Sequence, residues 1–149
     1  MKLIVPYTYL RPLVRAALEQ YNLHPTFVEL HGEDDYWNLL SQLWEEKESF
    51  VLNEHDVLPW PGAIQEIQNC PADWCSYTYR MKEGYGIHHA FGCTKIGQGL
   101  IEALPDAWIS VDSTHWYDLD AQLCIMARNA GITPHPHRPP VIHLKELPA

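Results

Sequence analysis

The stretch SFVLNEHDVLPWPGAI, residues 49–64, runs from an apolar strand through two acids and a proline-rich turn into the start of a helix. Glu54 and Asp56 therefore stand where a strand ends. Side chains two residues apart in an extended chain point the same way, and a turn at His55 can converge the two carboxylates on one hard cation. The stretch predicts a strand that delivers a binding site.

Glu54 and Asp56 also have a simpler interpretation, as residues that form a turn. A turn would more naturally use Asn, Asp or Gly without an apolar strand running directly into it. The strand before the two acids therefore favours metal or substrate binding.

Two strand–helix units precede this stretch. The first has a strand at 2–5 and a helix that begins with Pro12 in its first turn. The second has a strand at 26–30 and a helix with apolar residues at i, i+3, i+4, i+7 and i+8. The expected buried face of the first helix is Leu13, Ala16, Ala17 and Tyr21, and that of the second is Tyr36, Leu39, Leu40, Leu43 and Trp44.

Strand and helix alternate three times, since a strand at 50–53 is followed by a helix from Pro61 to Ile67. This pattern predicts an α/β fold with a Rossmann-like, mostly parallel sheet flanked by helices. A hairpin of strands 74–79 and 87–91 around a turn at 82–86 would make the sheet mixed. Two further helices are expected at 97–104 and 119–130, the second ended by Gly131 in the left-handed conformation.

The chain has 149 residues, which fits one domain, 1–149, and its formal net charge is −9 with a pI near 5.3. This charge argues against coating a nucleic acid or binding an anionic membrane, since both need clustered Lys and Arg. No apolar run reaches the ~18 to 20 residues of a membrane-spanning helix, and MKLIVPYTYL is too short for a signal peptide. We expect a cytoplasmic location.

The cysteines at 70, 75, 93 and 124 are few and irregularly spaced, which is typical of reduced, buried thiols. A sharper alternative is a zinc site that uses Cys70, Cys75, Cys93 and either His88 or His89. The four-residue gap in CPADWC suits zinc, but the second half of that set lacks a paired CxxC or HxxxH.

Three other features could carry chemistry. The loop at 6–11 follows the first strand, and ligands of open α/β sheets bind at the carboxyl ends of strands, so this loop should lie beside Glu54 and Asp56. Asp118 and Asp120 precede the long helix, where they serve either catalysis or helix capping. Of the late histidines, 135 and 137 fit a solvated tail, whereas 143 lies among apolar residues in a segment that must be docked.

Several segments, in order, resemble the GT-A fold nucleotide-sugar glycosyltransferases, especially the family-two-like inverting branch. KLIVPYTYLRPLVRAALEQY is similar to that family's N-terminal strand, loop and helix. FVLNEHDVLPWPGAIQEI resembles its Asp-x-Asp metal motif, with Glu54 in place of the first aspartate. HHAFGCTKIGQGLIEA, WYDLDAQLCIMARNAGI and PPVIHL resemble the acceptor-side segment, the helix opened by an acid, and a closing strand that carries a histidine.

This resemblance implies a nucleotide-binding half at 1–69 and an acceptor-side half at 70–149. It makes Asp56 and His143 metal ligands, and Glu54 a contact to the ribose or the metal-bound water. Asp120 would be the general base, with Asp118 the competing choice. The nucleotide pocket would be lined by Pro6, Tyr7, Thr8 and Arg11.

The implied reaction moves a sugar from a nucleotide diphosphate donor, such as a UDP-sugar, to a hydroxyl acceptor with inversion. A site of oxygens and one imidazole suits Mn²⁺ or Mg²⁺, with a slight preference for manganese. The alternative is a non-catalytic nucleotide- or sugar-binding module on a reduced GT-A scaffold. The small size leaves open a complete enzyme, a viral or accessory minimal form, or a degenerate remnant.

Overall fold

The computed structural model describes residues 1–80, 87–88 and 91–146. Its main sheet contains β1 (Lys2–Tyr7), β2 (Thr26–Glu29), β3 (Phe50–Asn53), β5 (Trp74–Tyr77), β8 (Cys93–Ile96) and β9 (His135–His137). The strand order is β2-β1-β3-β8-β5-β9. Only β8 pairs antiparallel with its neighbours in this sheet, so the other strands all run in one direction. The predicted α/β class with a mixed, mostly parallel sheet is confirmed.

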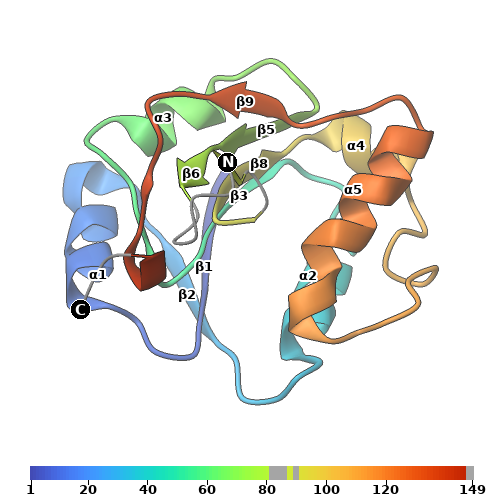
Figure 1. Cartoon of the computed structure of the whole chain (residues 1–149), viewed down its shortest axis with the longest axis horizontal. Coiled ribbons are helices and arrows are strands. Elements are labelled where there is room, and N and C mark those ends of the chain that lie inside the picture. The colour runs from blue at the N-terminus through green and yellow to red at the C-terminus, as the bar shows by residue number, and fades with distance from the viewer. Residues whose placement is uncertain (81–86, 89–90, 147–149) are drawn as a thin grey trace.

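Helices cover both faces of the sheet, and they form two layers that Figure 1 separates clearly. Among the described residues, every helix is too short or too polar to cross a bilayer. One layer holds α2 (Asp35–Glu45), α4 (Gln98–Ala103) and α5 (Leu119–Asn129), and the other holds α1 (Pro12–Glu19) and α3 (Ala63–Gln68). Short 3-10 turns occur at η1 (Gln20–Asn22), η2 (Trp116–Asp118) and η3 (Leu144–Glu146).

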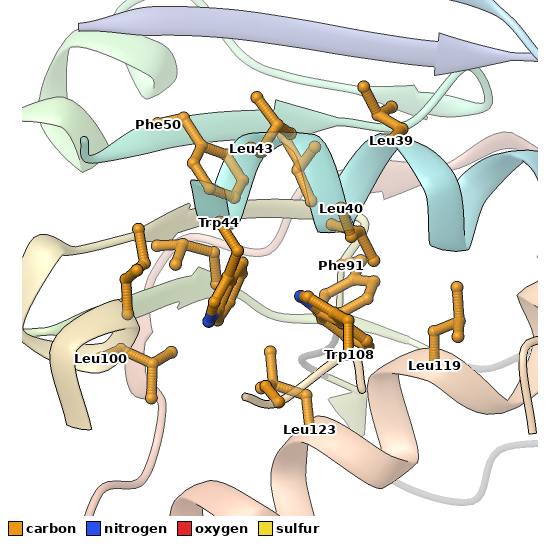
Figure 2. Packing of buried hydrophobic residues seen from close by; sticks show 14 of the residues in the cluster. Leu39, Leu40, Leu43, Trp44, Phe50, Phe91, Leu100, Trp108, Leu119 and Leu123 are labelled. Carbon is orange, nitrogen blue, oxygen red and sulfur yellow. The ribbon is translucent and has the colours of Figure 1, made fainter. Parts of the chain in front are cut away.

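The strands contribute alternate residues to two apolar cores, as the period of two in a strand requires. Ile4, Phe50 and Leu52 face the layer of α2, α4 and α5. Leu3 and Val51 face the layer of α1 and α3. Figure 2 shows the first core, in which Trp44 and Trp108 meet edge to face with ring centroids 5.4 Å apart. Both faces of the central strands are therefore buried, as in other doubly covered sheets.

The apolar face predicted for α2 is confirmed, since all its five residues are buried. The face predicted for α1 is wrong. Val14 and Leu18 are the buried residues of that helix, whereas Leu13 is exposed. Tyr21 lies beyond the helix in η1 with a φ of 60°, so it never continues the helical face.

Two short pairs of strands lie outside the main sheet. β6 (Tyr79–Arg80) pairs antiparallel with β7 (Ile87–His88), so the expected hairpin partners exist but form their own sheet. The main sheet is mixed because of β8, which the sequence patterns did not predict. β4 (Val57–Leu58) pairs antiparallel with β10 (Ile142–His143). The predicted turn at 82–86 and residues 89–90 of the predicted strand lie outside the described residues.

Two expectations about the cysteines and the tail are corrected. Cys70 and Cys75 form a disulfide bond, so the expectation of reduced thiols is wrong for this pair, whereas Cys93 and Cys124 are free. His135 and His137 are not in a solvated tail, because β9 pairs with β5 at the edge of the sheet. His135 is exposed, but the side chain of His137 is only 12% exposed. Tertiary pairing supplies a strand that the His-Pro-His sequence does not favour.

Candidate functional site

A cavity of about 540 Å³ opens where β1 and β3 end. This is the edge of an open α/β sheet at which ligands bind. Predicted site residues from both ends of the chain line it, together with several aromatic side chains. The lining residues that were predicted are Pro6, Thr8, Glu54, Asp56, Asp120 and His143.

Asp56 is buried, with three nitrogen-bearing side chains around one of its oxygens. Its Oδ2 lies 3.2 Å from Nζ of Lys145, 3.6 Å from Nε2 of His143 and 3.8 Å from Nε2 of His55. The side chain of Lys145 is 54% exposed, whereas those of both histidines are mostly covered. Asp56 is therefore a buried carboxyl group with two imidazoles and the ammonium group of Lys145 around one of its oxygens.

His143 reaches Asp56 because β10 docks on β4, which begins directly after Asp56. His143 is the register partner of Val57. The N–H of Leu144 also donates to the carbonyl oxygen of Asp56 at 2.7 Å. The ring of His143 stacks on Tyr79, with centroids 4.8 Å apart. A docked segment at 143 was expected, and the structure places it beside the acids.

Asn53 shapes the turn that carries Glu54 and Asp56. Its side chain is fully buried at the end of β3, and its amide nitrogen donates to the carbonyl oxygens of Glu54, at 3.1 Å, and of Val57, at 2.9 Å. The N–H of Glu54 donates to the carbonyl oxygen of Gly92 at 2.9 Å. These bonds hold the main chain on both sides of the two acids in a defined conformation.

Glu54 is partly buried beside Asp56, and this environment alters its acidity. Burial raises the pKa of Glu54 to about 7, and the charges of Asp56 and Asp120 raise it as well. The hydroxyl of Tyr36 lowers the pKa of Glu54, although its position does not meet the geometry of a regular hydrogen bond. Lys145 also lowers this pKa. Near neutral pH, Glu54 can therefore hold or release a proton.

Asp118 and Asp120, the two acids considered for the general base, have different environments. Asp120 lies in the first turn of α5, lines the cavity and accepts a hydrogen bond from the N–H of Ala121 at 2.7 Å. Asp118 accepts a hydrogen bond from the hydroxyl of Ser113 at 2.8 Å and does not line the cavity. The structure therefore brings Asp120, and not Asp118, to the same space as Asp56.

Tyr7 and Arg11, which were predicted to line the nucleotide pocket, lie next to this cavity in sequence but not among its lining residues. Tyr7 is the last residue of β1. The guanidinium of Arg11 lies 5.8 Å from the centroid of the Tyr9 ring. Of the predicted loop, Pro6 and Thr8 thus face the cavity.

His55 was missed by the sequence analysis, although it stands between the two acids. Its Nδ1 accepts a hydrogen bond from the N–H of Thr8 at 3.0 Å, which joins the loop after β1 to the loop after β3. Burial lowers the pKa of His55, while the charge of Asp56 opposes this change. The signal in the sequence was its place at the centre of the motif.

Other unpredicted residues complete the walls of the cavity. Trp116 and Tyr117 are exposed large aromatic side chains, 51% and 71% exposed, at its rim. Aromatic residues directly before an acid at the start of a helix could have indicated, from the sequence, a surface on which a ligand ring stacks. Lys145 gave no such signal, because only the docking of β10 brings it to Asp56. The unpredicted lining residues that carry polar or aromatic groups are Tyr36, His55, Tyr79, Phe91, Trp116, Tyr117 and Lys145.

Comparison with known proteins identifies the fold. Neither a protein-family model nor a curated protein sequence matches this chain. The structure is similar to that of a glycosyltransferase involved in the glycosylation of the major capsid of PBCV-1, with a TM-score of 0.54 and 12% identity, covering 93% of this chain and 81% of that one. It is also similar to A197 from STIV, with a TM-score of 0.53 and 11% identity, covering 82% and 78% of the two chains. The chain therefore has a small, Rossmann-like glycosyltransferase fold.

Proposed function

We propose that this protein is a metal-dependent glycosyltransferase that moves a sugar from a nucleotide diphosphate donor to a hydroxyl acceptor. The observation that carries the proposal is the cavity at the ends of β1 and β3. It brings Asp56 and His143 to one space with Asp120, which comes from a different layer of the fold. The likeness to a glycosyltransferase structure supports the same conclusion.

The donor atoms around Asp56 fit a divalent cation. A buried carboxylate with imidazole nitrogens nearby forms an oxygen and nitrogen set that suits Mn²⁺ and, less well, Mg²⁺. In the described part of the chain, Lys145 lies closest to that carboxylate, but its long and half-exposed side chain can turn away into solvent. When bound, the cation would neutralise the charge that grows on the diphosphate leaving group.

Two walls of the cavity suit the two ends of a nucleotide diphosphate donor. On one wall, the main chain of Thr8 is held by His55, next to the loop that carries the acids. On the other wall, Trp116 offers an exposed ring on which a base or a sugar can stack. A UDP-sugar is the donor that we expect.

Asp120 is the residue that we assign to the general base. In an inverting transfer, a carboxylate must take the proton of the acceptor hydroxyl while the donor bond breaks on the opposite side of the sugar. The carboxylate of Asp120 is fixed by its bond to the N–H of Ala121 and faces the cavity. Asp118 is the weaker choice, because Ser113 already engages it outside the cavity.

Glu54 has a supporting role in this proposal. Its raised pKa lets it carry a proton near pH 7, so it can donate a hydrogen bond to a ribose hydroxyl or to a water in the site. A cation bound beside it would favour the ionised form. With the metal bound, Glu54 would therefore release its proton and accept the hydrogen bond of the ribose hydroxyl or of the water instead.

The test is calorimetry with Mn²⁺ and UDP on wild-type protein and two variants. Asp56→Ala should abolish metal-dependent UDP binding. Asp120→Asn should retain that binding and lose sugar transfer, measured as release of UDP from a panel of UDP-sugars and acceptors. Absence of binding heat with any nucleoside diphosphate, in the presence of either cation, would overturn the proposal.

One observation favours the second candidate, a non-catalytic nucleotide- or sugar-binding module. Among the described residues, the cation nearest to Asp56 is the chain's own Lys145. A module of this kind would bind UDP in the presence of EDTA, and Asp56→Ala would then change the affinity little. Binding without any UDP release from UDP-sugars would support this candidate over the enzyme.

A further inference from the structure

A cluster of two cysteines and two histidines lies away from the cavity, on the side of the sheet that α3 covers. Cys70 follows α3, Cys75 belongs to β5, and His135 and His137 belong to β9. Ligand atoms of Cys70, His135 and His137 all lie within 4.8 Å of one another. Cys75 is joined to Cys70 by the disulfide bond.

Strand register explains why these residues meet. In the parallel pair of β5 and β9, Cys75 is the partner of His135 and Tyr77 is the partner of His137. Side chains two residues apart on a strand share one face, so both histidines can point toward the cysteines. The rings of His135 and His137 have centroids 5.2 Å apart.

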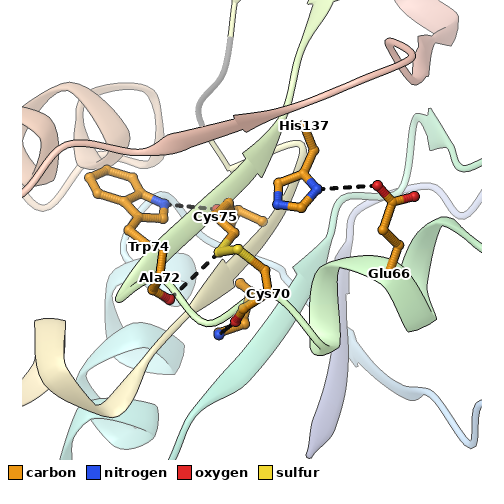
Figure 3. The surroundings of a disulfide bond; sticks show 8 residues. Glu66, Cys70, Ala72, Trp74, Cys75 and His137 are labelled. Atoms are coloured by element: carbon orange, nitrogen blue, oxygen red, sulfur yellow. Dashed lines mark hydrogen bonds and ion pairs between the residues drawn. A yellow bond between two sulfur atoms is a disulfide. The ribbon is translucent and has the colours of Figure 1, made fainter.

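His137 is oriented as metal-ligating histidines are. Its Nδ1 lies 3.5 Å from Oε1 of Glu66, and Figure 3 shows the ring between that carboxylate and the disulfide bond. Its Nε2 is buried and has no hydrogen-bond partner among the described residues. A carboxylate on one ring nitrogen, with the other nitrogen left for the metal, is the usual arrangement around zinc. A buried nitrogen without a partner is otherwise costly.

We propose that the reduced chain binds zinc through Cys70, Cys75, His135 and His137. Tetrahedral zinc with Zn–S distances of ~2.3 Å and Zn–N distances of ~2.0–2.1 Å holds its ligand atoms about 3.3 to 3.8 Å apart. The ligand atoms of Cys70, His135 and His137, within 4.8 Å of one another, therefore need to approach by up to about 1.5 Å. The sulfurs of Cys70 and Cys75, which are about 2.05 Å apart in a disulfide bond, must separate to about 3.8 Å once that bond is reduced. The spacing Cys-x4-Cys is also one that structural zinc sites use.

Zinc and the disulfide bond exclude each other, because the metal needs both sulfurs as thiolates. Binding releases the two thiol protons and forms two Zn–S and two Zn–N bonds. Hydrogen peroxide can then take two electrons from the sulfurs and join them, while two protons and the peroxide oxygens leave as two waters and the zinc is freed. The ammonium group of Lys95 donates to the carbonyl oxygen of Cys70, so a cation lies against the main chain of the residue that supplies one of the sulfurs.

Such a site would fasten β9 to the sheet. β9 is a short edge strand that pairs only with β5 among the described residues. Beyond β9, the chain continues to β10, which carries His143 to the cavity. The zinc site would therefore have a structural role and would not need the proposed transferase activity.

The experiment measures zinc in the full chain after purification with a phosphine reductant and dialysis against metal-free buffer. About one zinc per chain is expected, as structural sites hold their metal tightly. Cys75→Ser and His137→Ala should lose this zinc. Glu66→Gln should keep the fold and weaken zinc affinity by about 10- to 100-fold. Zinc should also protect Cys70 and Cys75 from alkylation, whereas half-exposed Cys124 reacts with or without zinc.

Matched controls separate this site from the cavity and from chance binding. Cys124→Ser and Asp56→Asn should retain the zinc. Protein oxidised with hydrogen peroxide should hold none. The proposal is overturned if the folded, reduced wild-type chain retains no zinc and shows no protection of the two thiols. It is equally overturned if Asp56→Asn alone removes the zinc, or if the oxidised chain binds it as well as the reduced one.

Discussion

The ammonium group of Lys145 lies 3.2 Å from Oδ2 of Asp56. A divalent cation on Asp56 would compete with this ammonium group. Because the lysine is half exposed, the pair is worth at most about 1 kcal/mol. Lys145→Met should therefore bind Mn²⁺ about two- to fivefold more tightly than the wild type in calorimetry without nucleotide. Lys47→Met, at an exposed position, is the control. Weaker binding by Lys145→Met would contradict competition.

Glu54→Gln tests the pH dependence that follows from the raised pKa of Glu54. Between about pH 4.5 and 7, the folded chain holds a proton on Glu54 that the unfolded chain has lost, so this residue makes stability fall as the pH rises. Glutamine does not titrate. The free energy of unfolding of the variant, relative to that of the wild type, should therefore increase from about pH 5 to about pH 8, by up to about 3 kcal/mol.

Urea unfolding of the variant and the wild type at about pH 5 and about pH 8, in EDTA, measures this change in relative stability. Glu45→Gln changes an exposed carboxylate and should show no such trend. The same difference between Glu54→Gln and wild type at both pH values would mean that Glu54 has an ordinary pKa.

Asn53→Ala should both destabilise the fold and weaken ligand binding. It removes the two hydrogen bonds from the Asn53 amide to the carbonyl oxygens of Glu54 and Val57, of which the second is buried. The expected loss is about 1 to 3 kcal/mol, measured by urea unfolding. Under conditions where the variant is folded, its heat of Mn²⁺ and UDP binding should be smaller. Asn69→Ala, at an exposed position, should change neither quantity.

Trp116→Ala should weaken UDP binding without unfolding the protein. Stacking of a base on an aromatic ring contributes about 1 to 3 kcal/mol, so the affinity should fall by roughly 5- to 150-fold. Because half of the Trp116 side chain is already exposed, the loss of stability should stay within about 1 to 2 kcal/mol. Trp116→Phe should restore most of the affinity, and Tyr21→Ala should leave it unchanged. Unaltered UDP affinity in Trp116→Ala would exclude stacking on this ring.

The parts of the fold that local patterns determine were predicted from the sequence. The buried face of α2 and the bounds of β3 agree with their patterns because burial against the sheet enforces the periodicity. The prediction of the buried face of α1 failed because its sequence permits two apolar faces, and only packing selects Val14 and Leu18. β8 and β9 were not predicted, because these strands form through pairing with segments far away in the sequence.

The residues of the candidate site likewise fall into those that the sequence predicts and those that only tertiary pairing brings to the cavity. The positions of Pro6, Thr8 and the two acids follow from the topology of parallel strands, which brings the ends of β1 and β3 to one edge. His55, which lies between the acids, was recognisable by position. Lys145 was not, since its contact with Asp56 depends on which segment docks against β4. The cysteine–histidine cluster likewise depends on the register of β9.

The pairing of β10 with β4 makes the cavity depend on a segment that follows the last strand of the main sheet. The strands of the main sheet all lie before residue 138, whereas His143 and Lys145 belong to the segment that follows and that docks on β4. A protease that cuts between β9 and β10 would separate those two groups from Asp56 without cutting any strand of the sheet. Ligand binding therefore reports whether the segment with His143 and Lys145 is docked on β4. A chain with a fully formed main sheet can still lack a complete site.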